Sequence, residues 1–329
     1  MRAVAVSPAK VILFGEHFVV SGNTAIAMSL DLQTKVVVEP SSNGAIQIKS
    51  EDLGVEAVFL SDGTLLRAFG NNAEAILRPV FEAASFTLRR LNRIGEGLRI
   101  TVRSNFPVGM GLGSSAATAV GTVSATARIF GYHLSKQDVF EAAYSLERIV
   151  HGHPSGVDQA AVTYGGLICY RNETVEARID PKKPPLLVIG NTGIRRSTGE
   201  FVGKVTMLRE KDPQEYRRIA SQAQIISEKA ADALRYGHAE ALGELMNENQ
   251  HFLELIGVSS PYLEKLISAA RSAGALGAKL TGGGGGGCMI ALVDETASKN
   301  VARQIEEAGG QVLPGTFVPR GVVTFIEEE

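Results

Sequence analysis

Three glycines and two serines stand close together in the stretch Pro107–Ala117, and their spacing could serve to bind an anion. The glycines are separated by single residues, so the backbone can take positive φ values and no Cβ atom keeps a ligand from the amides. The serines follow where a helix is expected to begin, and a helix N-terminus offers free N–H groups to an anion. The stretch therefore predicts a phosphate-binding loop. A tight strand-to-helix turn with Ser114 as its N-cap is the alternative.

This loop differs from two common nucleotide-binding motifs. No lysine follows the glycines, as a Walker loop requires, and Ser114 stands where the dinucleotide fingerprint needs its third glycine. No acidic residue stands about 20 residues further on to bind a ribose, which argues against a nicotinamide oxidoreductase.

Charged residues bracket one apolar segment near the N-terminus. Lys10 precedes the run Val11–Phe14, and Glu16 and His17 follow it. Charges at the ends of a buried strand are often only solvated, but three of them around one strand favour a functional site.

Two carboxylates further along the chain could take part in the same chemistry. Glu147 lies at the edge of the apolar stripe of a predicted helix, so it is either half-solvated or directed into a cleft. Asp158 ends a loop shaped by glycines and a proline. His151 and His153 in that loop suggest a metal, but no third ligand follows at a usable spacing.

Six consecutive glycines, residues 282–287, stand between two apolar segments. Such a run loses much backbone entropy on folding, and a flexible linker would not be flanked so closely by strands. We expect the run to approach a ligand or the first glycine loop, rather than to form a mere bulge.

The elements that would position these residues follow from hydrophobic periodicity. Residues 98–102 alternate as a strand that leads into the loop, and residues 114–130 predict a helix that stops at Gly131. The other predicted elements are strands at 3–6, 11–14, 18–20, 25–30, 35–39, 45–49, 186–190, 288–293, 311–313 and 322–326, and helices at 71–92, 135–150, 213–236, 238–255, 261–273 and 296–306.

Two linking segments and one boundary complete this prediction. Residues 7–10 are expected to be a turn and residues 195–199 a basic loop. The proline-rich stretch 181–185 predicts a boundary that divides the chain into domains 1–180 and 181–329, the second an α+β sandwich.

Composition excludes several classes of protein. The formal net charge of -2 and the lack of a basic run argue against a nucleic-acid partner. No segment approaches the roughly 18 apolar residues of a membrane span. The two cysteines make no disulfide framework, so a soluble, cytoplasmic protein is expected.

Three motifs in order resemble those of the GHMP kinases, named for galactokinase, homoserine kinase, mevalonate kinase and phosphomevalonate kinase. Pro107–Ala117 resembles the family's Pro-x-Gly-x-Gly-Leu-Gly-Ser-Ser-Ala motif. Lys10–Gly22 looks like the first motif in its mevalonate-kinase form, and Lys279–Cys288 resembles the third. The departures are Phe18 and Ser21, in place of Ala and Tyr, and a glycine at or beside 285 in place of Ala.

The resemblance implies a two-domain α+β fold and an ATP-dependent kinase that uses Mg²⁺. The N-terminal domain would be like domain 2 of ribosomal protein S5, and the C-terminal domain a ferredoxin-like α/β sandwich. The implied ATP-binding residues are Pro107, Gly109, Met110, Gly111, Leu112, Gly113, Ser114, Ser115 and Ala116, with Ser115 and Glu147 as Mg²⁺ ligands. Asp158 and Lys10 would be catalytic and paired with each other, and the acceptor would be bound by Lys10, Glu16, His17, Asp158, Arg196, Thr198 and Gly284.

The same resemblance favours mevalonate as the acceptor and its 5-hydroxyl as the site of phosphorylation. Gly15–His17 followed by Phe18–Val20 is similar to the mevalonate-kinase form, and Arg196 suits a carboxylate substrate. Phosphomevalonate, a sugar or homoserine as acceptor, and a non-catalytic metabolite sensor, are the alternatives. Asp158 would either remove the proton of the hydroxyl or only orient it, and a homodimer is a family-level expectation.

Overall fold

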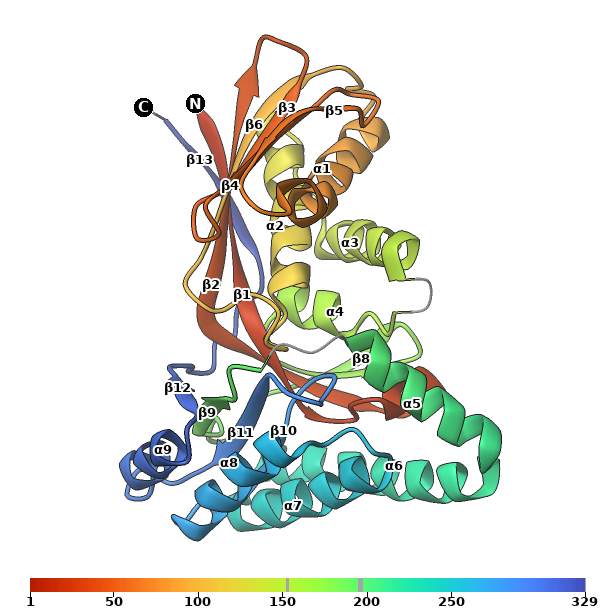
Figure 1. Ribbon diagram of the computed structural model, residues 1–329, viewed down its shortest axis with the longest axis vertical. Helices are drawn as coiled ribbons and strands as arrows, with labels where there is room; N and C mark the ends of the chain where they lie inside the picture. The colour runs from red at the N-terminus through yellow and green to blue at the C-terminus, as the bar shows by residue number, and fades with distance from the viewer. Residues whose placement is uncertain (152–153, 195–197, 329) are drawn as a thin grey trace.

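The computed structural model describes residues 1–151, 154–194 and 198–328, and has two parts, each built on one sheet (Figure 1). Within these residues, nine strands form the large sheet: β1 (Arg2–Phe14), β2 (Ala25–Ser41), β3 (Ile46–Ser50), β4 (Val55–Phe59), β5 (Leu65–Phe69), β6 (Gly97–Ser104), β7 (Leu167–Arg171), β8 (Thr174–Ile179) and β13 (Val323–Glu327). Their order is β13-β1-β2-β6-β3-β4-β5, and β7 pairs with β2 and β8. The pairing of β3 with β6 is parallel, and the other pairings are antiparallel.

Helices cover one face of this large sheet. They are α1 (Ala73–Arg90), α2 (Ser114–Ile129), α3 (Lys136–His151) and α4 (Val157–Tyr164). Helix α2 lies across β1 and β2, while α1 and α3 pack beside it (Figure 1). The phosphate loop predicted from the sequence therefore leaves the large sheet at the end of β6 and enters its central covering helix.

The lower part of the molecule is a four-stranded sheet with its own helices (Figure 1). The strand order is β10-β11-β9-β12. The elements of this part are β9 (Leu187–Asn191), β10 (Gly277–Leu280), β11 (Cys288–Leu292), β12 (Gln311–Leu313), α5 (Thr198–Lys211), α6 (Pro213–Tyr236), α7 (Ala239–Leu255), α8 (Pro261–Ser272) and α9 (Ser298–Glu307). A one-turn 3-10 helix, η1 (Phe18–Ser21), follows β1 and stands where the sequence predicted a strand.

The prediction of a turn at residues 7–10 is wrong. β1 runs through these residues as one continuous strand, and its register against β2 shifts between Pro8 and Ala9. A bulge of this kind lets a strand bend without leaving the sheet, so the proline is tolerated. β2 is likewise one strand rather than two. Its first residues, 25–30, are buried on both faces because they lie between the two parts of the molecule.

Helix prediction fails at two places near the site. Residues 157–164 form α4, and Thr198 begins α5 where a loop was expected. The long predicted helices are confirmed as α1, α3, α6, α7, α8 and α9. Among the helices of the described chain, none combines the length and the apolar character that crossing a membrane requires.

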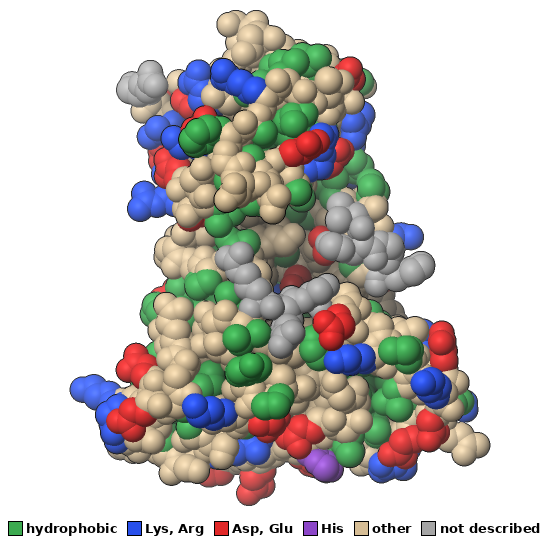
Figure 2. All heavy atoms as spheres, viewed as in Figure 1, with side chains coloured by type: hydrophobic (Ala, Val, Ile, Leu, Met, Phe, Trp, Pro, Cys, Tyr) green, Lys and Arg blue, Asp and Glu red, His purple; other side chains and the backbone are tan. Residues whose placement is uncertain are grey.

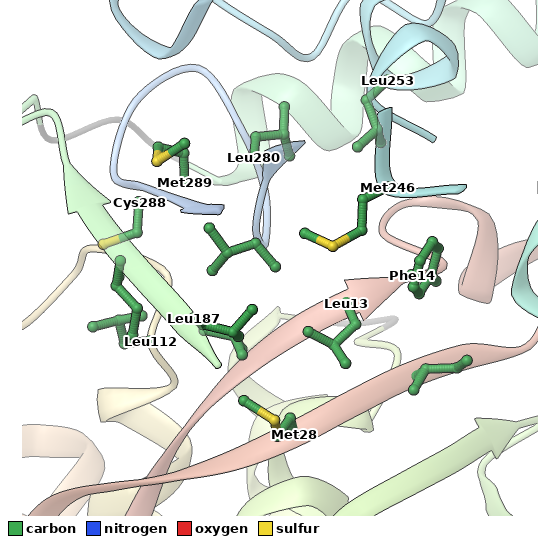
Figure 3. Packing of buried hydrophobic residues seen from close by; sticks show 14 of the residues in the cluster. Leu13, Phe14, Met28, Leu112, Leu187, Met246, Leu253, Leu280, Cys288 and Met289 are labelled. Carbon is green, nitrogen blue, oxygen red and sulfur yellow. The ribbon is translucent and has the colours of Figure 1, made fainter. Parts of the chain in front are cut away.

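One apolar core joins the two parts. In Figure 3, Leu13 and Met28 of the large sheet point toward Leu280 and Met246 of the lower part, and Leu112 of the glycine loop lies beside Cys288. The expected α+β architecture in two parts is therefore correct, with a shared core between them.

One strand does not follow the predicted division of the chain at residue 180. β13, from the last residues of the chain, pairs with β1 and so belongs to the large sheet rather than to the lower part. The two chain ends consequently lie near each other (Figure 1).

Candidate active site

The loop after β6 has the geometry of an anion cradle. Gly109, Gly111 and Gly113 have φ values of 79°, 86° and 79°, the left-handed region that favours glycine. Met110 and Leu112 between them are buried and anchor the loop, whereas Gly109 and Gly111 are exposed. The backbone of the loop is thus open on the side opposite its anchors.

Helix α2 starts directly after this loop, and its N-cap is Gly113 rather than the Ser114 of the alternative interpretation. A glycine has no side chain to cap the first amides of the helix. The Ser114 hydroxyl turns back to accept a hydrogen bond from the Gly109 N–H at 3.4 Å, while Ser115 is exposed. This arrangement favours an anion site over a plain turn.

Lys10 and Asp158 meet beside the loop. The Lys10 ammonium lies 2.8 Å from Asp158 Oδ1 and donates a hydrogen bond to Gly111 O at 3.1 Å. The Lys10 side chain is 2% exposed and that of Asp158 is 38% exposed. A buried cation therefore holds a carboxylate that remains open to solvent.

The local structure explains how these two residues come together. Lys10 and Ile12 share one face of β1 because side chains alternate along a strand, and Ile12 packs in one cluster with Val157 of α4. Asp158 lies in the first turn of that helix, after Gly156 with φ 82°. A Cβ on Gly156 would lie 2.4 Å from the Tyr170 hydroxyl, so the turn that presents Asp158 requires glycine.

The six-glycine run lies against the first glycine loop, as expected from the sequence. A Cβ on Gly282 would be 3.4 Å from Gly111 O, and one on Gly287 would be 2.8 Å from Met110 O. Gly284, predicted to contact the acceptor, lies against Val258, whose carbonyl oxygen would be 2.1 Å from an added Cβ.

Glu16 and His17 lie at the junction of the two parts. The Glu16 side chain is fully buried in an ion pair with Lys279, and burial raises the pKa of its carboxyl. His17 has a φ of 60°, and its Nε2 lies 3.1 Å from Gly283 O. Burial lowers the pKa of His17 to about 4, so the ring is neutral at pH 7 and donates this hydrogen bond.

Two other predicted residues have little or no structural description. Arg196 lies outside the described residues. Thr198 is the first residue of α5, and its side chain is not described. Their predicted contacts with the acceptor remain predictions.

A cavity of about 250 Å³ adjoins the loop on the side of the large sheet. Ser115 and Glu147 both line it, together with Gly109 and Asp52. Apolar walls come from the β3–β4 turn, α1, β6 and α3, and include Leu53, Ile76, Val80, Val102 and Leu146. A largely apolar cavity with polar groups at one place has the general form of a small-molecule binding site.

Comparison with known proteins decides the family. The model of the GHMP kinases N terminal domain matches residues 78–166, and the GHMP kinases C terminal model matches residues 230–311. The chain belongs to the GHMP kinase family. The resemblance inferred from the three motifs is thereby confirmed.

Within this family, the curated relatives found include several mevalonate kinases. That of Thermococcus gammatolerans is 39% identical over 318 residues, 94% of this chain and 94% of the relative. That of Pyrococcus furiosus is 38% identical over 318 residues, with the same coverage of both chains.

Solved structures agree. The Methanococcus jannaschii mevalonate kinase has a TM-score of 0.83 at 26% identity and covers 96% of this chain and 98% of its own. The L. major mevalonate kinase in complex with R-mevalonate has a TM-score of 0.80 at 29% identity, covering 96% of each chain.

The donor set of this GHMP kinase fits a magnesium ion bound together with a nucleotide. Ser115 and Glu147 supply two hard oxygen donors to one cavity, next to the phosphate loop. Mg²⁺ prefers such ligands and keeps several waters, so two protein oxygens and phosphate oxygens suffice. The described residues hold no group of three or more His, Cys, Asp or Glu side chains that could bind a metal without a nucleotide.

Sequence reasoning missed the cavity walls and the partner of Glu16. The cavity walls come from four separate segments of ordinary apolar residues, and no local pattern distinguishes them from core. Lys279 lies within the third motif, but only the fold shows that it faces Glu16. On the face shown in Figure 2, the molecule narrows between its upper and lower parts.

Proposed function

We propose that this chain transfers the γ-phosphoryl group of ATP to the 5-hydroxyl of mevalonate. The observation that carries the proposal is the ion pair of Asp158 with the buried Lys10, held against Gly111 of the phosphate loop. Phosphoryl transfer requires an acceptor hydroxyl in line with the phosphate and positive charge around it. Asp158 would orient the hydroxyl and Lys10 would bring the charge, both at one place. The choice of mevalonate follows the relatives, which match this chain over nearly its full length.

The chain's own residues have distinct roles in this reaction. The loop Gly109–Ser115, exposed at Gly109, Gly111 and Ser115, would bind the phosphates, and the base would enter the apolar cavity beside it. Asp158 would accept the proton of the attacking hydroxyl or orient it, while Lys10 fixes the carboxylate and brings positive charge to the reacting group. Ser115 and Glu147 would hold Mg²⁺, which when bound neutralises charge on the phosphate oxygens.

The acceptor would enter from the side of Asp158 that is open to solvent. Because His17 is neutral at pH 7, it would offer hydrogen bonds rather than a charge there. Arg196, which the resemblance predicts to bind the acceptor, would then supply the positive charge that pairs with the carboxylate of mevalonate.

A coupled assay of ADP release tests this function, with mevalonate, phosphomevalonate, homoserine and galactose as acceptors. We expect turnover with mevalonate, and Asp158→Asn should lower kcat by about 10²- to 10⁴-fold while ATP still binds. Asp180→Asn, at an exposed carboxylate, is the control and should leave kcat unchanged. ATP binding without turnover of any acceptor would favour a metabolite sensor, and near-normal turnover of Asp158→Asn would refute the role of Asp158.

A further inference from the structure

The phosphate loop and the segment that leads into the glycine run 282–287 both bind to one edge of β1, in the second half of the strand. Strand β13 pairs with β1 only at residues 2–6. Further along, Lys10 N–H donates to Leu112 O at 3.0 Å, and Ile12 N–H donates to Thr281 Oγ1 at 2.8 Å. The Thr281 hydroxyl also donates to Ile12 O at 3.0 Å. The phosphate loop and the segment that begins the glycine run thus bind to neighbouring positions of one strand.

A buried ion pair stands at the end of this edge. Glu16 and Lys279 are 263 residues apart in sequence, and both side chains are 0% exposed. The Lys279 ammonium also donates to Leu280 O at 2.7 Å, and His17 next to Glu16 bonds Gly283 O. The pair therefore joins the first motif to the strand that leads into the glycine run.

The pair is a poor source of stability in itself. Burial raises the pKa of Glu16 and lowers that of Lys279, so the interior disfavours the charged form of each group. Glu16 Oε2 has no hydrogen-bond partner within the described chain. A buried pair with an unsatisfied oxygen stabilises a fold little, but either partner alone would be an uncompensated buried charge. The arrangement specifies a geometry more than it adds stability.

Glu16 is more enclosed than the carboxylate that would meet the acceptor. Its carboxylate lies inside the junction, whereas Asp158, which must meet the acceptor, is 38% exposed. The family resemblance implied that Glu16 contacts the acceptor, and that contact stays a prediction. The enclosure of its carboxylate favours a positioning role instead.

We propose that Glu16 and Lys279 are positioning residues that fix β10 and the glycine run 282–287 on the edge of β1, so that the run holds the phosphate loop in its ATP-binding shape. The run touches this loop through Gly282 against Gly111 and Gly287 against Met110. The inference rests on the proposed function only in taking ATP as the ligand of the loop.

The test compares Glu16→Gln, Lys279→Met and the double variant with the wild type. ATP binding is measured by calorimetry without acceptor, and kcat and both KM values by the coupled assay. Each single variant leaves a buried charge or amide without its partner, so we expect the Kd for ATP to rise about tenfold or more. The double variant has no unpaired charge, but it also lacks the ion pair that fixes β10. Its Kd should therefore stay raised by about the same factor as in the single variants, rather than by the product of their two factors. Glu295→Gln removes an 84% exposed carboxylate from the surface pair with Lys183 and serves as control, with no change expected.

Two outcomes would overturn the proposal. One is that Glu16→Gln raises the KM for mevalonate while the Kd for ATP stays unchanged, as a direct acceptor contact requires. The other is unchanged ATP binding in all three variants. A wild type that binds ATP but phosphorylates no acceptor would instead contradict the proposed function, and the ATP measurements would still decide this inference.

A second substitution keeps the test decisive if the charge variants do not fold. Thr281→Val removes the hydroxyl that bonds Ile12 N–H and Ile12 O, and Thr281→Ser keeps it. We expect weaker ATP binding for Thr281→Val and near-normal binding for Thr281→Ser. Equal ATP affinity in the two variants would refute the positioning role of this edge.

Discussion

Replacing Gly113 by alanine should show how the position of the Lys10–Asp158 pair affects kcat, apart from any effect on the stability of the fold. At Gly113 the φ is 79°, and the added Cβ would lie 2.8 Å from Lys10 Cγ and 3.0 Å from Lys10 Cε. The left-handed backbone costs an alanine about 1–2 kcal/mol. Lys10 is buried, so its stem cannot swing into solvent and must shift within the site.

The shift of Lys10 should dominate the effect on catalysis. A misplacement of about 1 Å at a reacting group can lower the rate about 10²-fold, so we expect kcat of Gly113→Ala to fall by that factor. Gly131→Ala is the matched control, because Gly131 has a φ of 82° and no atom within 4 Å of the added Cβ. It should lose the same amount of stability from backbone strain, about 1–2 kcal/mol, with kcat unchanged.

The assay is kcat at saturating ATP and mevalonate, with thermal unfolding of both variants. Gly109→Ala, with the same φ of 79° and no protein atom near its Cβ, adds a second comparison. Because Gly109 is on the exposed side of the loop, its Cβ should raise the KM for ATP rather than move Lys10. The reasoning is refuted if Gly113→Ala and Gly131→Ala lose equal stability and have the same kcat.

Two further predictions concern the metal and the pH dependence of folding. Ser115→Ala or Glu147→Gln should raise the Mg²⁺ concentration needed for half-maximal activity, and an unchanged Mg²⁺ titration would contradict their role as ligands. For His17, the folded pKa of about 4 is below the ordinary histidine value of 6.5. The unfolded chain therefore binds more protons between these two values, and the free energy of unfolding falls as the pH drops through that window. Urea unfolding at about pH 7 and about pH 5 measures this loss of stability. The variant His17→Asn is suitable because asparagine tolerates a left-handed backbone. Its loss of stability between the two pH values should be smaller than that of the wild type by at most about 2 kcal/mol. Equal pH dependence of the two proteins would refute the assignment to His17.

The sequence by itself indicated the candidate residues of the site and the family. The glycine spacing of 109–113 and the serines after it predicted a phosphate loop, because local backbone freedom and a helix N-terminus depend on neighbouring residues alone. The helices from 213 to 272 followed for the same reason, since a 3.6-residue period with proline starts and glycine stops is a local signal. The motif resemblance then predicted the family and the pairing of Lys10 with Asp158, and the ion pair is present in the structure.

The tertiary structure decided what those residues contact. Glu16 is buried against Lys279, a partner that 263 residues separate from it and that no local pattern reveals. The cavity beside the loop takes its apolar walls from four segments whose residues read as ordinary core. β1 passes through Pro8 without a turn because β2 pairs with it on both sides of the bulge. Burial and long-range pairing arise only when distant segments meet, so they belong to the fold rather than to any stretch of sequence.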